Sequence, residues 1–511
     1  MIEGLRALDL LVVATYLGAV VGMSIYFARR QRTGDDYFLA GRSMGGPLLA
    51  MSILANQASA VSLIGAPAFV ALREGGGLRW LQYELALPLA MLALIAVLLP
   101  ALRSVPGASI YAYPDRRFGP GTRRALASAF LLSRGLSVGV ILYASSLVVA
   151  KALGVSLEAA LILLGLFSVF YTSLGGIVAD IWSDALQLVL LWGGTLVSAL
   201  FILEEHGLAV LRAIPPERTR ALVADATALD AGGDFTLWPM LLGGLFLYVS
   251  YYGCDQSQAQ RLLASRDDRS ARRALALNGL LRFPLVLTYC GFGLLLAGLL
   301  RVDPTFAASM QGQPADSLVP TFMMSYLPAG LRGLLLAAIL AAAMSSIDSA
   351  LNSLAAVTLE DVFDRPSSAQ GVWLSRGVSL LWGLFAVGSG LAFSRGSKGV
   401  LELVNQVGSA FYGPVLAVFV VGALLPAVTG RGALIGLGAG LAANASLASA
   451  APQVSWLWWN PVGFLAAVAA SMAATRPWPK LHAPAWPRGE TALLAGAFVV
   501  MFGLLAALSS F

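Results

Sequence analysis

Long apolar segments follow one another along the chain, separated by short polar connections. Fourteen of them approach or exceed the length of about 20 residues that a helix needs to cross a bilayer. They lie at 8–28, 47–70, 79–100, 125–150, 156–174, 181–203, 238–254, 274–300, 331–357, 374–393, 400–425, 431–449, 454–474 and 490–510. Because a helix satisfies its own backbone polar groups in lipid, the pattern predicts an all-α integral membrane protein with about 14 transmembrane helices.

Composition and charge support this class of protein. Hydrophobic residues make up 58% of the 511 residues and charged residues 12%, where soluble proteins carry roughly 25%. No polar stretch is long enough for a separate soluble domain, so we expect one transmembrane domain over 1–511. Basic residues gather in alternate connections, including the arginines from Arg261 onward in 255–273. This bias predicts a multi-pass protein of the cell (plasma or inner) membrane with both termini outside.

The residue types needed for common hydrolytic chemistry are missing from the apolar segments. The two histidines, His206 and His482, both fall in polar connections, which excludes an embedded HExxH zinc site. The two cysteines, Cys254 and Cys290, fall in or near apolar segments and are expected to pack as small residues. The net charge of +6 follows the connections, so it does not indicate a nucleic-acid partner. We therefore expect no enzyme and no catalytic residue.

The apolar segment 331–357 contains an unusual polar group. Ser345, Ser346, Asp348 and Ser349 place hydroxyl and carboxylate oxygens within about one helical turn. Ionisable residues at membrane depth are costly and usually functional. Because these oxygens are hard ligands, the segment predicts a site for a small hard cation.

Two other apolar segments contain interruptions typical of transporter helices. SILANQASAVSLIGAP, at 52–67, carries several polar residues and ends near Gly65 and Pro67. YVSYYGCDQSQAQ, at 248–260, is broken by Gly253 before a polar cluster. A broken helix frees backbone groups that can bind an ion. We therefore expect both segments to contribute to a binding site.

Six motifs carry a resemblance to a known family. They are DDYFLAGRS (35–43), SILANQASAVS (52–62), YTSLGGIVADIWSDALQ (171–187), YYGCDQSQAQRLLAS (251–265), MSSIDSALNSLAAVTLEDVF (344–363) and GPVLAVFVVG (413–422). With these six motifs in this order, the chain resembles the sodium/solute symporters, the family of the sodium/glucose, proline, sialic acid, iodide and monocarboxylate cotransporters. The resemblance implies a LeuT-like core of two inverted five-helix repeats, 47–203 and 238–425, with flanking helices at 8–28 and 431–510.

The resemblance also implies a sodium site between two helices from opposite repeats. Its ligands would be the backbone carbonyls of Ala55, Ala58 and Ala342 and the hydroxyls of Ser345 and Ser346. About five neutral oxygens suit a hard monovalent cation. The alternative for the two serines is helix packing or back-bonding to carbonyls one turn earlier.

A second cation site is a further expectation. Asp184 matches an acidic position that some family members use for a second sodium ion. Asp348 stands where other members have Ser or Thr, and Ser349 keeps a hydroxyl. Because a low dielectric favours the neutral carboxyl, a proton is the alternative to this second sodium ion. Asp184 could instead be a helix cap or an interface residue.

Candidate solute contacts come from several segments: Gln57, Ser59, Ser62, Glu84, Arg134, Tyr248, Tyr251, Arg282 and Gln406. Glu84, Arg282 and Gln406 are included by resemblance to the sugar carriers, and Tyr251 is expected to act as an inner gate. One carboxylate and two guanidinium groups leave a positive charge that an anionic solute could neutralise. The alternative is internal pairing of Glu84 with one arginine.

We therefore expect a sodium-coupled secondary active symporter that imports one small polar organic solute by alternating access. The solute could be a sugar, a carboxylate or an amino-acid-like molecule. The expected partners are this solute, Na+ and the lipid bilayer, with no obligate protein partner. A non-transporting solute sensor on the same fold and a proton-coupled symporter are the alternatives.

Overall fold

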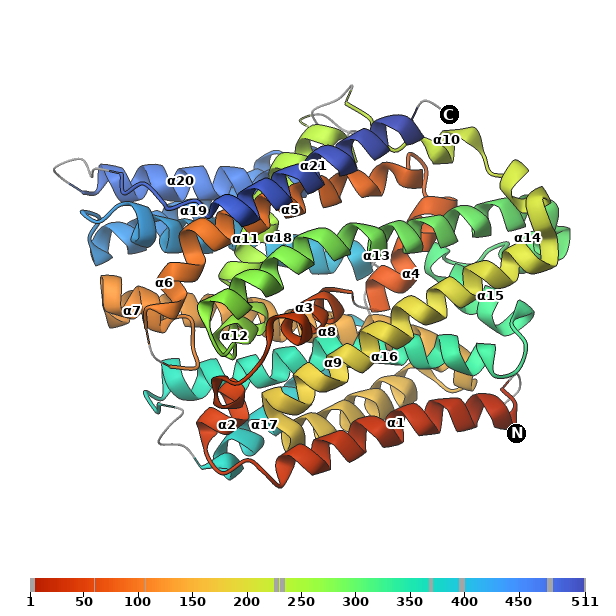
Figure 1. Cartoon of the computed structure of the whole chain (residues 1–511), viewed down its shortest axis with the longest axis horizontal. Coiled ribbons are helices and arrows are strands. Elements are labelled where there is room, and N and C mark those ends of the chain that lie inside the picture. The colour runs from red at the N-terminus through yellow and green to blue at the C-terminus, as the bar shows by residue number, and fades with distance from the viewer. Residues whose placement is uncertain are drawn as a thin grey trace.

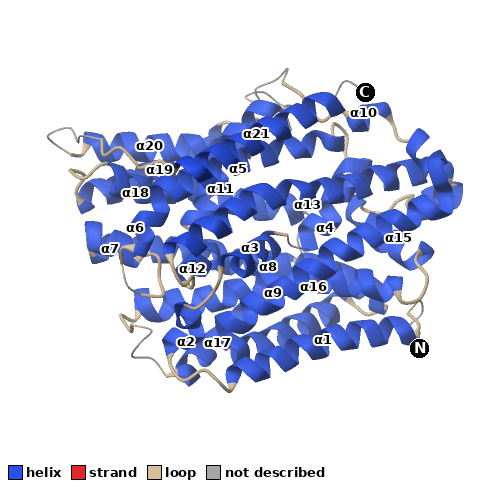
Figure 2. Ribbon diagram, viewed as in Figure 1, coloured by secondary structure: helices blue, strands red, loops and turns tan. Residues whose placement is uncertain are grey.

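Helices joined by short connections form the whole of the described structure (Figure 2). The computed structural model describes residues 5–58, 60–105, 107–224, 229, 235–366, 371–394, 400–475 and 481–509, without the side chains of 60, 61, 152 and 400–407. No strand occurs among these residues apart from one isolated bridge between Met44 and Ser265. The predicted all-α class is confirmed at this level.

The first half of the chain contains α1 (Ala7–Ala28), α2 (Gly34–Leu39), η1 (Ala40–Arg42), α3 (Gly46–Gln57), α4 (Ala60–Leu72), η2 (Gly77–Leu85), α5 (Ala86–Ala93), η3 (Leu94–Leu98), α6 (Leu99–Arg103), α7 (Ala112–Phe118), α8 (Pro120–Leu153), α9 (Leu157–Arg212) and α10 (Pro216–Thr219). The second half contains η4 (Pro239–Gly243), α11 (Gly244–Gly253), α12 (Gln256–Leu263), α13 (Asp268–Val302), α14 (Pro304–Ser309), η5 (Ala315–Ser317), α15 (Leu318–Tyr326), α16 (Leu331–Val357), η6 (Thr358–Val362), α17 (Val372–Phe393), α18 (Val400–Leu424), α19 (Gly430–Ala450), η8 (Trp456–Trp458), α20 (Trp459–Ala473) and α21 (Arg488–Leu508).

Many of these helices can cross a membrane. Within the described residues, nine are long and apolar enough, and α3 with α4 forms a tenth span if the pair, bent by 56°, counts as one. The predicted spans 238–254 and 454–474 correspond to shorter helices, α11 with 10 residues and α20 with 15. The multi-pass class is supported, while the count of fourteen stays a prediction.

The most enclosed helix is α16. In an 18-residue apolar stretch of Leu331–Val362, 94% of the residues are buried. In the corresponding stretches of α1 and α21, 17% of the residues are buried. Figure 1 shows α1 and α21 along opposite edges of the molecule, with α16 and α3 between them. Helices α9, α8, α1, α17, α3 and α4 all pack against α16. The serine-rich segment therefore lies in the protein interior, and α1 and α21 keep apolar surface for lipid.

Both predicted interruptions are present. Helix α3 ends at Gln57, and Ala58 adopts a non-helical conformation (φ −79°, ψ 68°) before α4 begins at Ala60. Helix α11 ends at Gly253, and Asp255 starts α12 by accepting a 2.8 Å hydrogen bond from the Ser257 backbone N–H. An Asp at this position caps the free N–H groups of the new helix. The polar residues at each break thus end one helix and begin the next.

A third interruption lies within α9. Gly176 has φ 57° and ψ −169°, which interrupts the 56-residue element, and a second interruption follows at Gly207 (φ 56°, ψ −145°). A Cβ at this position would lie 2.8 Å from the ring of Tyr37, so only glycine fits. The break falls between the predicted spans 156–174 and 181–203, which are therefore separated as expected.

Candidate functional site

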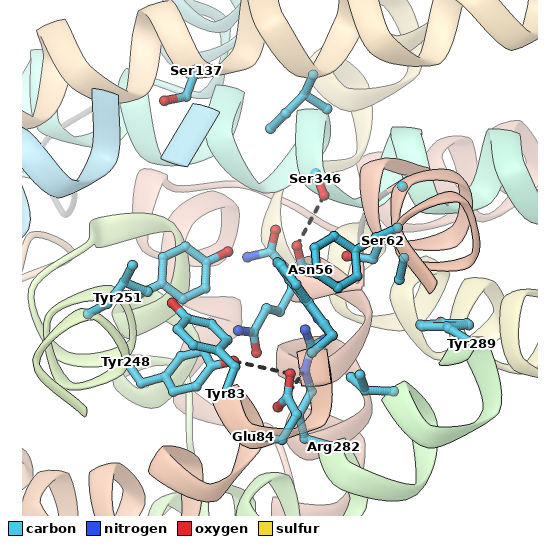
Figure 3. Close-up of a pocket in the computed structure, with 18 of the residues that line it drawn as sticks. Asn56, Ser62, Tyr83, Glu84, Ser137, Tyr248, Tyr251, Arg282, Tyr289 and Ser346 are labelled. Atoms are coloured by element: carbon cyan, nitrogen blue, oxygen red, sulfur yellow. Dashed lines mark hydrogen bonds and ion pairs between the residues drawn. The ribbon is translucent and has the colours of Figure 1, made fainter. Parts of the chain in front are cut away.

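The end of α3 meets the middle of α16. The Ser346 hydroxyl donates a 3.0 Å hydrogen bond to the carbonyl of Asn56 (Figure 3). Ala55, Ala58 and Ala342 are buried on the same two elements. The last carbonyls of a helix have no partner within that helix and are available to other groups. The structure therefore brings together the two segments on which the predicted sodium site depends.

Asp184 lies beside this junction. Its Oδ1 accepts a hydrogen bond from the Ser345 hydroxyl, and its Oδ2 accepts a 2.5 Å hydrogen bond from the Ser52 hydroxyl. Asp184 is completely buried on α9, between α3 and α16. The first and the second predicted ion sites are therefore adjacent, because Ser345 connects them.

Arg261 completes this buried network, contrary to its interpretation as a charge in an inner connection. Its side chain is 1% exposed and lies 2.7 Å from Asp184 and 3.1 Å from Asp180. Its guanidinium group also donates to Ser349 and, at 2.6 Å, to Ser52. No sequence pattern indicates the pairing of Arg261 with Asp180, because their contact joins α12 to α9 across the fold. The one sequence feature that bears on Arg261 is Asp255, which caps the start of α12 and so places Arg261 on that helix.

Asp348 accepts hydrogen bonds from neutral groups. The Tyr171 hydroxyl donates at 2.5 Å to Oδ2, and the Thr172 hydroxyl donates at 2.6 Å to Oδ1. Arg261 forms its ion pairs with the other two acids, Asp180 and Asp184, and makes none with Asp348 in the described part of the chain. Two of the three buried carboxyl groups thus share the guanidinium group, and the third, Asp348, accepts from hydroxyl groups.

A cavity of about 150 Å³ opens next to the α3–α16 junction. Its lining includes the predicted residues Gln57, Ser62, Glu84, Arg134, Tyr248, Tyr251, Arg282 and Ser346. Ser59 lies outside the described residues, and the side chain of Gln406 is not described. The lining also includes Trp80, Tyr83, Tyr289 and Tyr412, which sequence reasoning missed. In an apolar segment such aromatic residues cannot be distinguished from ordinary core residues.

One side of the cavity is formed by Glu84 and Arg282 (Figure 3). Glu84 Oε2 lies 3.5 Å from Arg282 Nε, and the Tyr248 hydroxyl donates a 3.2 Å hydrogen bond to Glu84 Oε1. All three side chains are buried. Glu84 was interpreted either as a solute contact or as the internal partner of an arginine. The structure contains the internal pair, Glu84 with Arg282.

Arg134 reaches the same cavity from α8. Its Nη1 lies 3.8 Å from Asp255 Oδ2, and its guanidinium carbon lies 5.9 Å from the centre of the Tyr251 ring. Arg134 is thus placed between the start of α12 and the cavity.

Broken helices around a buried polar cavity are typical of secondary transporters. The sodium:solute symporter family matches residues 37–440, and the chain belongs to this family. It is therefore a transporter that uses sodium as its coupling ion, and it is not an enzyme.

Similar proteins agree with this assignment. The chain is 29% identical to the sodium/iodide cotransporter of Homo sapiens over 443 residues, which cover 85% of this chain and 67% of that protein. It is 31% identical to the sodium-dependent multivitamin transporter of Oryctolagus cuniculus, covering 85% and 69%. It is 29% identical to sodium-coupled monocarboxylate transporter 1 of Xenopus laevis, covering 85% and 70%.

A solved structure shares the fold. A substrate-bound, outward-open Na+-coupled sialic acid symporter superposes with a TM-score of 0.80, over 93% of this chain and 99% of that chain, at 23% identity. The two chains therefore share one fold over most of their length.

Proposed function

We propose that the protein imports one small polar organic solute together with sodium, by alternating access. The solute would occupy the 150 Å³ cavity, and sodium would bind at the α3–α16 junction. The observation that carries this proposal is the position of Ser346, which lines the cavity and also contacts the end of α3.

The proposed sodium ion would be held by carbonyls of Ala55, Ala58 and Ala342 and by hydroxyls of Ser345 and Ser346. Ser346 already contacts the Asn56 carbonyl, so a short movement could bring an ion between the helices. A cation there would hold α3 against α16 through shared oxygen ligands. Because α3 also carries Gln57 on the cavity wall, ion binding and solute binding would stabilise the same helix position.

The two helices belong to the two proposed repeats, α3 to 47–203 and α16 to 238–425. An ion between them would stabilise one relative arrangement of the repeats, and its loss would permit another. The sodium gradient would thereby drive solute uptake.

For a second cation we propose a site at Asp184, Asp348 and Ser349 that forms when Arg261 moves away. Arg261 now contacts both Asp184 and Ser349, and a second positive charge beside it would be repelled. Movement of α12 would withdraw the guanidinium group and leave the two acids for an ion.

A proton-coupled symporter is the second candidate. The observation in its favour is Asp348, a buried carboxyl group whose described hydrogen-bond donors are the neutral hydroxyls of Tyr171 and Thr172. In proteoliposomes without a sodium gradient, this candidate requires uptake driven by an inward proton gradient and lost in Asp348→Asn.

Sodium-dependent counterflow tests the main proposal. Proteoliposomes loaded with unlabelled solute should accumulate labelled solute when Na+ is present and lose this accumulation when Na+ is replaced by choline. A solute sensor would bind the labelled compound without accumulating it, and that result would reject symport.

A further inference from the structure

A groove of about 540 Å³ lies on the outside of the bundle, between the last turns of α1 and helix α9. It is lined by residues at the end of α1, just after it, and on α9: Gly22, Met23, Tyr26, Phe27, Arg30 and Trp182. A Cβ at Gly22 would have no other atom within 4 Å, so the groove is open at that point. Since α1 keeps most of its apolar surface outside the protein, this groove faces lipid. It is separate from the solute cavity and from the proposed ion sites.

The groove lies at the level where the membrane meets water. Figure 1 shows the end of α1 on the same side of the molecule as α2, α7 and α12, opposite the N-terminus, α10 and α14. Tyr26 is 50% exposed and Trp182 is 46% exposed. Such side chains are enriched at membrane interfaces, where their rings lie among the lipid headgroups. The groove therefore connects the apolar layer with the headgroup layer.

Arg30 places a positive charge at the polar end of the groove. Its guanidinium carbon lies 4.2 Å from the centre of the Tyr26 ring, a cation–π contact that holds the side chain in position. Among the described residues Arg30 forms no ion pair, and it is exposed. A guanidinium group held in this way has N–H groups available, and phosphate oxygens are well suited to accept from them.

The charged residues after α1 leave a positive excess beside the groove. The basic ones are Arg29, Arg30 and Arg32, and the acidic ones are Asp35 and Asp36 in the first turn of α2. Asp36 already accepts a 3.0 Å hydrogen bond from the backbone N–H of Arg32, and the start of a helix stabilises negative charge. Three guanidinium groups thus exceed two carboxylates by one charge.

The acidic residues of α9 do not cancel this excess. Asp180 and Asp184 lie two residues before and after Trp182, but both are buried in the bundle and paired with Arg261. Trp182 is the member of this group that is exposed beside α1. An anion in the groove would therefore meet Arg30 without a facing carboxylate from α9.

We propose that this groove binds an anionic phospholipid, with the phosphate on Arg30 and one acyl chain lying across Gly22 against Trp182. Basic pockets between transmembrane helices on the cytoplasmic side recognise anionic headgroups, and the membrane supplies such a lipid directly to this face. A soluble phosphate would use Arg30 alone and leave the apolar part of the groove unfilled. The lipid uses both parts. This site is independent of the solute and of sodium.

Fluorescence quenching tests the site on the purified full chain in phosphatidylcholine vesicles. Part of the lipid is replaced by brominated phosphatidylglycerol or by brominated phosphatidylcholine, and the signal of Trp182 is the difference between the unaltered chain and Trp182→Phe. Brominated phosphatidylglycerol should quench this signal at about one-fifth of the mole fraction that brominated phosphatidylcholine requires, because one arginine near the membrane surface gives about five-fold preference. Equal quenching by the two lipids would overturn the proposal.

A soluble competitor separates a lipid site from a simple anion site. Glycerol 3-phosphate, in ten-fold molar excess over the brominated phosphatidylglycerol, should leave the quenching unchanged because it lacks an acyl chain. If it abolishes the preference for phosphatidylglycerol, the groove is an anion site and the lipid proposal is wrong.

Variants assign the two parts of the groove. Arg30→Gln should reduce the preference for phosphatidylglycerol to near unity, and Arg30→Lys should keep most of it because the charge remains. Gly22→Leu should fill the groove and weaken quenching by both lipids to the same extent. Arg488→Gln is the matched control, since Arg488 is exposed at the start of α21, on the opposite edge of the bundle (Figure 1). If Arg30→Gln keeps the full preference, or if Arg488→Gln reduces it equally, the assignment of the phosphate to Arg30 is wrong.

Discussion

At the scale of single residues, Ser346 and Arg261 carry most of the functional argument. Ser346 links the cavity to the end of α3, whereas Arg261 joins α12 to Asp180 and Asp184 on α9. Ser346 stands out in the sequence because it belongs to a cluster of serines and an aspartate within an apolar span. Arg261 was misread because an arginine after a helix break is indistinguishable from a charge in a connection until its partners are known.

Replacing Ser346 by Ala removes one proposed sodium ligand. We expect the sodium concentration for half-maximal uptake to rise about ten-fold, which corresponds to about 1.4 kcal/mol. Uptake in proteoliposomes at graded Na+ measures this shift. Ser145→Ala is the control, because Ser145 bonds to the Ile141 carbonyl of its own helix and does not line the cavity. An unchanged sodium dependence in Ser346→Ala would remove Ser346 from the site.

Replacing Arg261 by Gln leaves Asp180 and Asp184 buried without their guanidinium partner. Loss of one partner of a buried ion pair costs about 3–5 kcal/mol, so we expect a clear fall in thermal stability in detergent. Adding Asp184→Asn should restore part of the stability, because it removes one uncompensated charge. Arg266→Gln is the matched control, since the Arg266 side chain is 66% exposed. Equal stabilities of the two single variants would contradict the buried network.

At the scale of elements, the sequence predicted the helix breaks better than the contacts between helices. The polar cluster near Asn56 and the residues around Gly253 indicated two interruptions, and both are present. These breaks are local, since glycine, proline and capping residues determine them. The cavity wall was predicted only in part, because its aromatic residues come from η2, α11, α13 and α18 and meet only through packing.

The break at Gly176 allows a direct test. Gly176→Ala would place a Cβ 2.8 Å from the Tyr37 ring in a backbone conformation with φ 57°. We expect destabilisation of about 1–3 kcal/mol, measured by thermal unfolding in detergent. Gly193→Ala, in the same element with nothing within 4 Å, should leave stability unchanged or raise it slightly. A Gly176 variant as stable as the Gly193 variant would show that the turn does not require glycine.

At the scale of the whole molecule, burial distinguishes the central helices from those that face lipid. The sequence identified the apolar segments, but not which of them lie at the centre, because lipid and protein interior favour the same apolar residues. The structure places α16 at the centre and α1 and α21 at the periphery. The orientation of this bundle in the membrane remains the prediction derived from the basic residues.

Cysteine labelling tests that orientation. The native Cys254 and Cys290 are buried, so a new surface cysteine can be followed against a low background. In right-side-out vesicles, a membrane-impermeant thiol reagent should label Glu217→Cys. It should label Arg266→Cys only after the membrane has been permeabilised. Both replaced side chains are largely exposed, at 67% and 66%. The reverse labelling pattern would place both termini inside.

The unequal number of carboxyl and guanidinium groups around α16 has an electrical consequence. Asp180, Asp184 and Asp348 lie deep in the bundle, and Arg261 pairs with the first two of them. A cation or proton that neutralises the remaining charge must therefore travel through part of the transmembrane field. Each elementary charge moved through the whole field exchanges about 2.3 kcal/mol per 100 mV. Membrane voltage should therefore displace charge in the carrier, as a transient current, before any solute has bound.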